Sequence, residues 1–140
     1  MTKKEPLPIL GFDPGRDKCG VAIVNEDGEL YYHAVIKSYD VIQQLNFLQK
    51  KFFFRLLVIG DQTTSENWKN YLEKELLFSV PIVKIDERNS TLEARNRYWK
   101  MYPPNFIRRL IPESLRIPNR SIDDIVAILL VERFLQTSKK

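Results

Sequence analysis

Short apolar runs alternate with helical repeats along the chain, a pattern that predicts an α/β fold. Residues 7–13 form an apolar run that ends in Asp-Pro-Gly, and the apolar segments 20–25 and 30–36 flank an Asp-Gly turn that is typical of a β-hairpin. These three segments predict an antiparallel meander. Continuous apolar runs at 55–60 and 81–85 predict two further strands of the buried, parallel kind.

Four other segments carry apolar residues at the spacing of an amphipathic helix. One begins near Ser38 and runs for about fourteen residues, and the others cover 66–78, 91–99 and 121–136. Strands joined through a helix lie parallel in one sheet. We therefore expect a mixed five-stranded sheet, an antiparallel meander followed by parallel strands, flanked by helices.

Length and composition fit one globular domain. The chain has 140 residues, of which 44% are hydrophobic and 29% charged, and such values exclude disordered and collagen-like classes. We expect a single domain over 1–140, with a short tail at 1–6 and a basic, proline-rich loop at 100–120. Apolar runs are too short for a membrane span or a secretion signal, so we expect a soluble, cytoplasmic protein without membrane contact.

The scarcity of cysteine and histidine narrows the possible chemistry. Cys19 and His33 are the single residues of their types, which excludes an intramolecular disulfide and a multi-cysteine zinc site. His33 lies in a strand pattern, where we expect a structural role. Catalysis, if present, therefore rests on carboxylates.

Acidic residues follow three of the predicted strands and open the last helix. They are Asp13, Asp61, Asp86, Glu87, Asp123 and Asp124. The carboxyl ends of parallel strands gather at one sheet edge, and clustered carboxylates favour a hard cation such as Mg²⁺ or Mn²⁺. Two such ions can drive phosphodiester hydrolysis without His or Cys. Each acid also has a structural alternative in a turn or a helix cap, and Ser121 with Asp124 matches a capping box.

Positive charge is concentrated in one segment. Residues 95–120 hold seven of the 22 Lys and Arg but one of the 18 Asp and Glu, a net charge of +6 against −2 for the rest of the chain. Aromatic residues lie among these cations, a combination that suits a nucleic acid, although a solvated basic loop is an equal alternative. The candidate nucleic-acid-binding residues, including two beside the first strand, are Arg16, Lys18, Arg95, Arg97, Lys100, Arg108, Arg109 and Arg116.

Three segments in order resemble one known family. Residues 9–24 contain a strand that ends in Asp-Pro-Gly and continues to Gly-Val-Ala, residues 86–94 begin Asp-Glu-Arg, and residues 122–130 place an Asp at the start of an apolar helix. Together they resemble the YqgF (RuvX) group of the RuvC-like ribonuclease H fold, which comprises pre-16S rRNA nucleases and Holliday junction resolvase-like proteins. The resemblance implies a ribonuclease H-like fold and a Mg²⁺- or Mn²⁺-dependent endonuclease acting on structured RNA or branched DNA.

The same resemblance assigns Asp13, Glu87 and Asp123 as catalytic, metal-binding carboxylates. The Gly-Asp-Gln sequence at 60–62 departs from the Gly-x-Pro loop usual in the group and is closer to RuvC, which makes Asp61 another candidate for the second metal ligand. RuvC also carries an extra acid where this chain has Arg120. An inactive nucleic-acid-binding protein with the same fold is the alternative, and monomer and homodimer both stay open.

Overall fold

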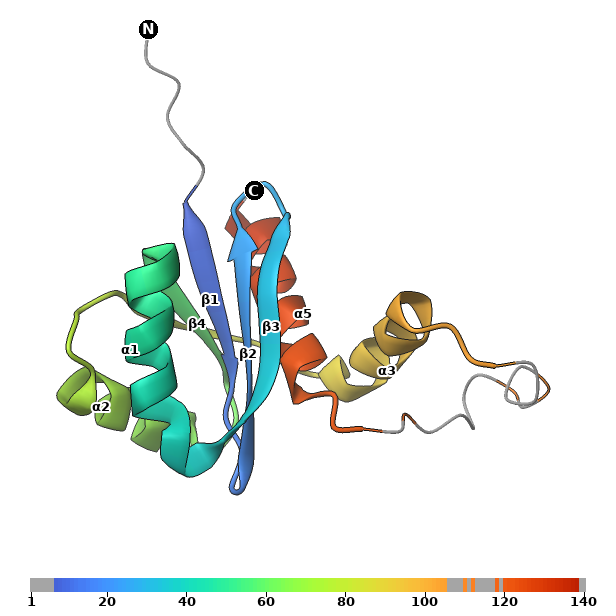
Figure 1. Cartoon of the computed structure of the whole chain (residues 1–140), viewed down its shortest axis with the longest axis horizontal. Helices are drawn as coiled ribbons and strands as arrows, with labels where there is room; N and C mark the ends of the chain where they lie inside the picture. Colours follow the sequence, from blue (N-terminus) through green and yellow to red (C-terminus); the bar gives the residue numbers. More distant parts are fainter. Residues whose placement is uncertain (1–6, 106–109, 111, 113–117, 119, 139–140) are drawn as a thin grey trace, which may run out of the picture.

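A five-stranded mixed sheet forms the centre of the molecule (Figure 1). The structure, a computed structural model, describes residues 7–105, 110, 112, 118 and 120–138. The strands are β1 (Pro8–Asp13), β2 (Lys18–Asn25), β3 (Leu30–Lys37), β4 (Leu56–Gly60) and β5 (Ile82–Ile85), in the spatial order β3-β2-β1-β4-β5. β1, β2 and β3 pair antiparallel, whereas β4 pairs parallel to both β1 and β5. The predicted meander and parallel strands are confirmed.

Helices cover both faces of this sheet. They are the short 3₁₀ helix η1 (Ser38–Asp40), α1 (Val41–Phe52), α2 (Ser65–Glu75), α3 (Ser90–Met101) and α5 (Asp123–Ser138). α1 and α2 lie on one face and α5 on the other, while α3 extends away from the sheet beside the start of α5 (Figure 1). No helix in the described part of the chain is long and apolar enough to cross a membrane.

Two apolar clusters, one on each face, hold the layers together. The first packs β1, β2 and β4 against α1 and α2, with Phe12, Leu45 and Leu72 fully buried. The second packs the other face against α3 and α5. α5 lies so close to β1 that a Cβ added at Gly11 would come within 2.2 Å of the Ala127 carbonyl oxygen. Glycine at position 11 therefore allows the helix to rest directly on the central strand.

The helix ends differ in detail from the sequence-based expectations. α2 ends at Glu75, three residues before the predicted end, and the Leu77 side chain beyond it is 82% exposed. Leu76 is already extended, and the Leu77 N–H donates to Asn46 instead of continuing the helix. Asp40 and Thr64 are the N-cap residues of α1 and α2, and neither makes a side-chain capping bond.

Candidate carboxylate site

Three carboxylates from distant parts of the chain meet at one end of the sheet. Asp13 is the last residue of β1, Glu87 follows β5, and Asp123 is the first residue of α5. The Asp123 carboxyl group lies close enough to Asp13 to raise the pKa of that carboxyl. The Gln62 side-chain amide donates to both Asp13 Oδ1 (3.2 Å) and Glu87 Oε2 (2.9 Å). The amide therefore links Asp13 to Glu87.

Glycines make room for two of these carboxylates. A Cβ at Gly60, at the end of β4, would lie 2.5 Å from Glu87 Oε2, so the Glu87 side chain lies directly over that strand. A Cβ at Gly20, which pairs with Asp13 across β1 and β2, would lie 1.8 Å from the Asp123 carbonyl oxygen. Both glycines allow the close approach of an acidic element to the sheet.

The cluster is electrostatically strained. Burial, followed by the charges of Asp123 and Glu87, raises the pKa of Asp13 to about 8, and the Asp13 residue is only 7% exposed. Burial and the neighbouring Asp61 also raise the pKa of Glu87, against a smaller opposing effect of Arg133. Acids that are buried together in this way favour either a shared proton or a bound cation.

Asp61 and Asp86 lie at the margin of the cluster. Asp61 is exposed, and its carboxylate accepts a long hydrogen bond, 3.4 Å, from the Glu87 backbone N–H. Asp86 pairs with Arg88 at the surface, and this pairing lowers its pKa. Arg133 of α5 donates to the carbonyl oxygens of Asp86 and Arg88, both at 2.8 Å, and so fixes the loop that carries Glu87.

The predicted capping box at the start of α5 does not form. The Ser121 hydroxyl contacts the Asp123 carboxylate, and the first helical hydrogen bonds are accepted by the carbonyl of Ile122. The Asp124 side chain turns to the opposite side, where it pairs with His33 and Arg120. Asp123 and Asp124 therefore serve different sites although they are neighbours.

The cluster contains the residue types that bind a divalent cation, but their side chains do not converge on one ion position. In the part of the chain that the structure describes, no three His, Cys, Asp or Glu side chains are positioned to hold a metal ion. The Gln62 amide lies between Asp13 and Glu87 and donates to one oxygen of each carboxylate. Carboxylate oxygens are the ligands that Mg²⁺ and Mn²⁺ prefer. Displacement of the amide would open the site to such an ion.

The candidate nucleic-acid-binding cations fall into three groups. Arg16, Lys18 and Lys100 are exposed. Arg97 is held in a two-hydrogen-bond ion pair with Glu132 of α5, and the Nε of Arg95 is buried with no hydrogen-bond partner among the described residues. The remaining candidates, Arg108, Arg109 and Arg116, lie outside the described residues, as does most of the expected 100–120 loop.

Comparison with known proteins identifies the relatives of this chain. It is 30% identical over 146 residues to a protein of Xylella fastidiosa (strain M12) named "Putative pre-16S rRNA nuclease", an alignment that covers 93% of this chain and 90% of the relative. The chain belongs to the YqgF family. A second family member with the same name, from Coxiella burnetii (strain RSA 331 / Henzerling II), is 25% identical over 150 residues, 95% of each chain.

Other comparisons add little to the YqgF assignment. No family model matches the sequence. Among solved structures, a ROK family transcriptional regulator is similar with a TM-score of 0.38 and 14% identity over 66% of this chain and 31% of that one, which is too distant to support an inference.

Two residues that shape this YqgF site were missed by sequence reasoning. Gln62 directly follows Asp61 at the end of a strand, so its position was visible, but an amide carries no charge signal. Arg133 lies in the second half of α5, and nothing in the local sequence connects it to the loop at Asp86.

Proposed function

We propose that this YqgF protein is a metal-dependent endonuclease that hydrolyses phosphodiester bonds in pre-16S rRNA, built on a ribonuclease H-like fold. The names of its relatives support the nuclease assignment and the RNA substrate. The observation that carries the proposal is the convergence of Asp13, Asp123 and Glu87, with Asp13 almost fully buried among acids.

In this proposal Asp13 and Asp123 hold the cation and Glu87, rather than Asp61, completes the set. Glu87 shares the Gln62 bridge with Asp13, whereas Asp61 is exposed and is not among the groups that raise the pKa of Asp13. When bound, Mg²⁺ or Mn²⁺ supplies activation of the attacking water and stabilisation of the leaving oxygen. The buried carboxylates fix the position of that charge at the carboxyl end of β1.

The test is cleavage of a labelled pre-16S rRNA fragment, with a four-way DNA junction as the second substrate. We expect RNA cleavage that requires Mg²⁺ or Mn²⁺, is abolished by a chelator and is lost in Asp13→Asn. Cleavage of the junction instead would replace the RNA by branched DNA as the substrate. Absence of cleavage of both substrates under all metal conditions would refute the nuclease proposal.

A second function, binding of nucleic acid without turnover, is favoured by one observation. The Gln62 amide already donates a hydrogen bond to Asp13 and another to Glu87, so both carboxylates have a partner without a cation. A pure binding protein would keep its RNA affinity in Asp13→Asn and show no metal-induced stabilisation. The same cleavage experiment, extended by a binding measurement, separates the two functions.

A further inference from the structure

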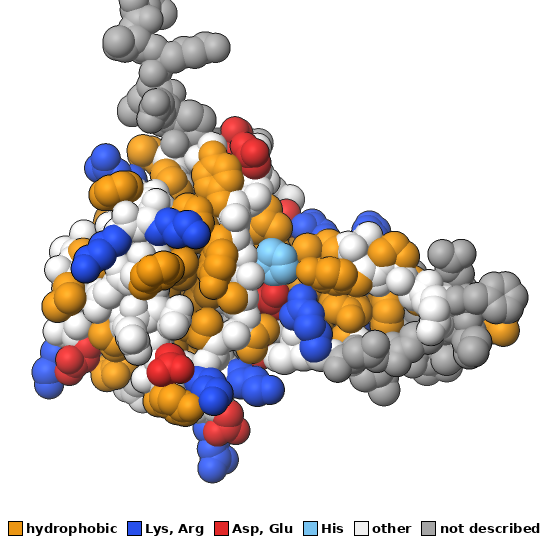
Figure 2. All heavy atoms as spheres, viewed as in Figure 1, with side chains coloured by type: hydrophobic (Ala, Val, Ile, Leu, Met, Phe, Trp, Pro, Cys, Tyr) orange, Lys and Arg blue, Asp and Glu red, His pale blue; other side chains and the backbone are white. Residues whose placement is uncertain are grey.

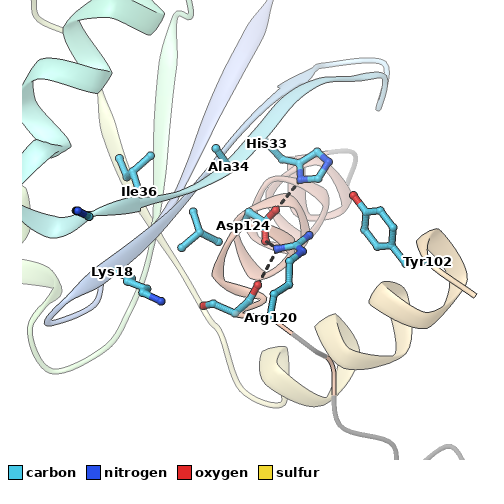
Figure 3. A pocket seen from close by; sticks show the side chains of 10 residues that line it. Lys18, His33, Ala34, Ile36, Tyr102, Arg120 and Asp124 are labelled. Atoms are coloured by element: carbon cyan, nitrogen blue, oxygen red, sulfur yellow. Dashed lines mark hydrogen bonds and ion pairs between the residues drawn. The ribbon is translucent and has the colours of Figure 1, made fainter. Parts of the chain in front are cut away.

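A pocket lies on the other side of the α5 N-terminus from the carboxylates. It measures about 550 Å³ and lies between the edge strand β3, the start of β2, the end of α3 and the residues that precede α5 (Figure 3). This size is within the range of small-molecule sites, about 300–1,000 Å³. Asp124 lines the pocket, and the preceding residue, Asp123, belongs to the carboxylate cluster.

The single acid of the pocket is already neutralised. Asp124 Oδ2 lies 2.6 Å from His33 Nδ1, and Asp124 Oδ1 accepts from Arg120 at 3.0 Å. The Arg120 guanidinium also lies 5.5 and 5.4 Å from the ring centres of Tyr98 and Tyr102, within cation–π range. These contacts hold His33, Arg120 and the Tyr102 ring in fixed positions around the pocket, as the close view shows (Figure 3).

Two lysines add positive charge at the mouth of the pocket. Lys18 and Lys37 face each other across β2 and β3, and both are exposed. Neither is paired with a carboxylate in the part of the chain that the structure describes, although Lys37 also lies over the Tyr39 ring. After the Asp124 charge is cancelled, the pocket is left with a positive rim, which attracts an anion.

The rest of the lining is apolar and aromatic. The Val35 side chain of β3, with the backbone of Ala34 and Ile36 beside it, forms one wall, and Tyr102, 43% exposed, stands opposite. In the space-filling view, hydrophobic side chains lie on both sides of the histidine, with acidic and basic side chains just below it (Figure 2). An apolar wall with an aromatic ring and a cationic rim matches one chemical unit, a base joined to a phosphate.

A base can enter such a pocket only when it is unpaired. In a duplex both faces of the base are stacked and the strand presents its phosphates alone, whereas an unpaired base can lie against aromatic and apolar side chains. We infer that this pocket binds an unpaired nucleotide of the RNA, its base between β3 and Tyr102 and its phosphate at Lys18 and Lys37. This inference rests on the proposed function for the identity of the nucleic acid.

The position of the pocket predicts which part of the RNA the bound nucleotide would belong to. Because Asp123 and Asp124 are consecutive, a strand that crosses the first turn of α5 would meet the carboxylate cluster and the pocket in succession. The pocket would therefore select RNA that is single-stranded beside the bond to be cut.

The experiment measures binding to a 12-nucleotide single-stranded RNA and to the same RNA in a perfect duplex, by fluorescence anisotropy in EDTA so that no cleavage occurs. The test variants are Lys18→Ala/Lys37→Ala, which removes the rim, Tyr102→Ala, which removes the ring, and Val35→Trp, which fills the space. The matched control is Lys50→Ala/Lys51→Ala, which removes two exposed lysines from the end of α1. Tyr102→Phe, which keeps the ring, serves as the conservative variant.

We expect each test variant to lose about 10-fold or more in affinity for the single strand and less than about 3-fold for the duplex. The double lysine variant should also flatten the dependence of log affinity on log salt by about 1. Tyr102→Phe and the α1 variant should bind like the wild type. Equal losses for both RNAs, or no loss in any test variant, would overturn the inference. Because Lys18 and Lys37 are exposed, the double lysine variant should fold, and it tests the inference even if Val35→Trp fails to fold.

The result for the pocket can be told apart from the result for the proposed nuclease function, because affinity is measured without metal and cleavage is measured with metal. Selective loss of single-strand binding in a protein that cleaves neither substrate would support the pocket and refute the nuclease. Normal cleavage by the wild type together with unchanged binding in every pocket variant would support the nuclease and refute the pocket.

Discussion

Two consecutive acids at the start of α5 have opposite surroundings. Asp124 faces His33 and Arg120 and accepts a further hydrogen bond from the Ile125 N–H at 3.0 Å. Asp123 faces Asp13, itself an acid, and its hydroxyl donor is Ser121. Both acids gain from the positive end of the helix dipole. A position at the helix terminus therefore does not tell a structural acid from a functional one. The charges that surround each acid make that distinction.

The difference has a consequence for stability. Asp124 is buried and fully compensated, so it should stabilise the fold, whereas the acids around Asp13 repel one another and should destabilise it until a proton or a cation enters. Retention of such a destabilising cluster is typical of a functional site. The following predictions test this contrast from the largest effect to the smallest.

The largest effect should be on cleavage. We expect Asp13→Asn and Asp123→Asn each to lower the cleavage rate by about 10³-fold, because each removes a carboxylate ligand of the cation that would activate the water and stabilise the leaving oxygen. Asp86→Asn is the matched control, since Asp86 adjoins Glu87 in sequence but pairs with Arg88 at the surface. The rates are measured under single-turnover conditions, and an equal loss in the control would contradict the assignment.

Removal of the compensated acid should have the largest effect on stability. Asp124→Ala leaves His33 and Arg120 without their shared partner, and we expect a loss of about 3 kcal/mol in the free energy of unfolding. For a chain of this length the melting temperature should fall by about 10 °C. Thermal and urea unfolding measure both quantities. A change as small as that of the surface variant Asp86→Ala would show that the Asp124 network does not stabilise the fold.

Asp13→Asn should have the opposite effect on stability, and only at neutral pH. The pKa of Asp13 is about 8 in the folded protein and 3.8 in the unfolded chain. Between these values the folded state binds one more proton than the unfolded state, so wild-type stability should fall as the pH rises from 4 to 8. We expect Asp13→Asn to be more stable than the wild type at pH 7.5, by an amount that falls toward zero near pH 4. Urea unfolding at the two pH values tests this, and a variant that is less stable at pH 7.5 would refute it.

The strands and the central carboxylates were predictable from the sequence because their signals are local. An apolar run that ends in an acid, as at Asp13, marks a buried strand and its exit, and helical spacing located α1 and α5. The parallel direction of β4 and β5 followed from the general rule on crossover connections. What these signals share is that a few neighbouring residues carry them.

The contacts that separate Asp123 from Asp124 were not predictable in the same way. Both acids fit a helix start, and the partner of Asp124, His33, lies 91 residues away on another strand. Gln62 likewise acts through two acids that are 49 and 25 residues distant. Such pairings depend on tertiary packing, which no local pattern encodes.

Metal-induced stabilisation should be a smaller effect and should distinguish Glu87 from Asp61. At a Mg²⁺ or Mn²⁺ concentration ten times the dissociation constant, we expect the wild type to gain about 1.4 kcal/mol. Glu87→Gln and Asp13→Asn should lose this gain, and Asp61→Asn should keep most of it. The melting temperature with and without metal is the measurement. Loss of the gain in Asp61→Asn but not in Glu87→Gln would make Asp61 the second ligand.

The smallest effect should come from the amide that now links the acids. Gln62→Ala removes two hydrogen bonds, so we expect a loss of about 1 kcal/mol without metal. Because the amide lies between the two acids and bonds one oxygen of each, its removal should increase the stabilisation by metal rather than reduce it. Melting temperatures with and without Mn²⁺ separate the two effects, with Gln43→Ala on the exposed side of α1 as the control. A weaker metal response in Gln62→Ala would mean that the amide helps to hold the ion, and Gln62 would then join the carboxylates as a positioning residue.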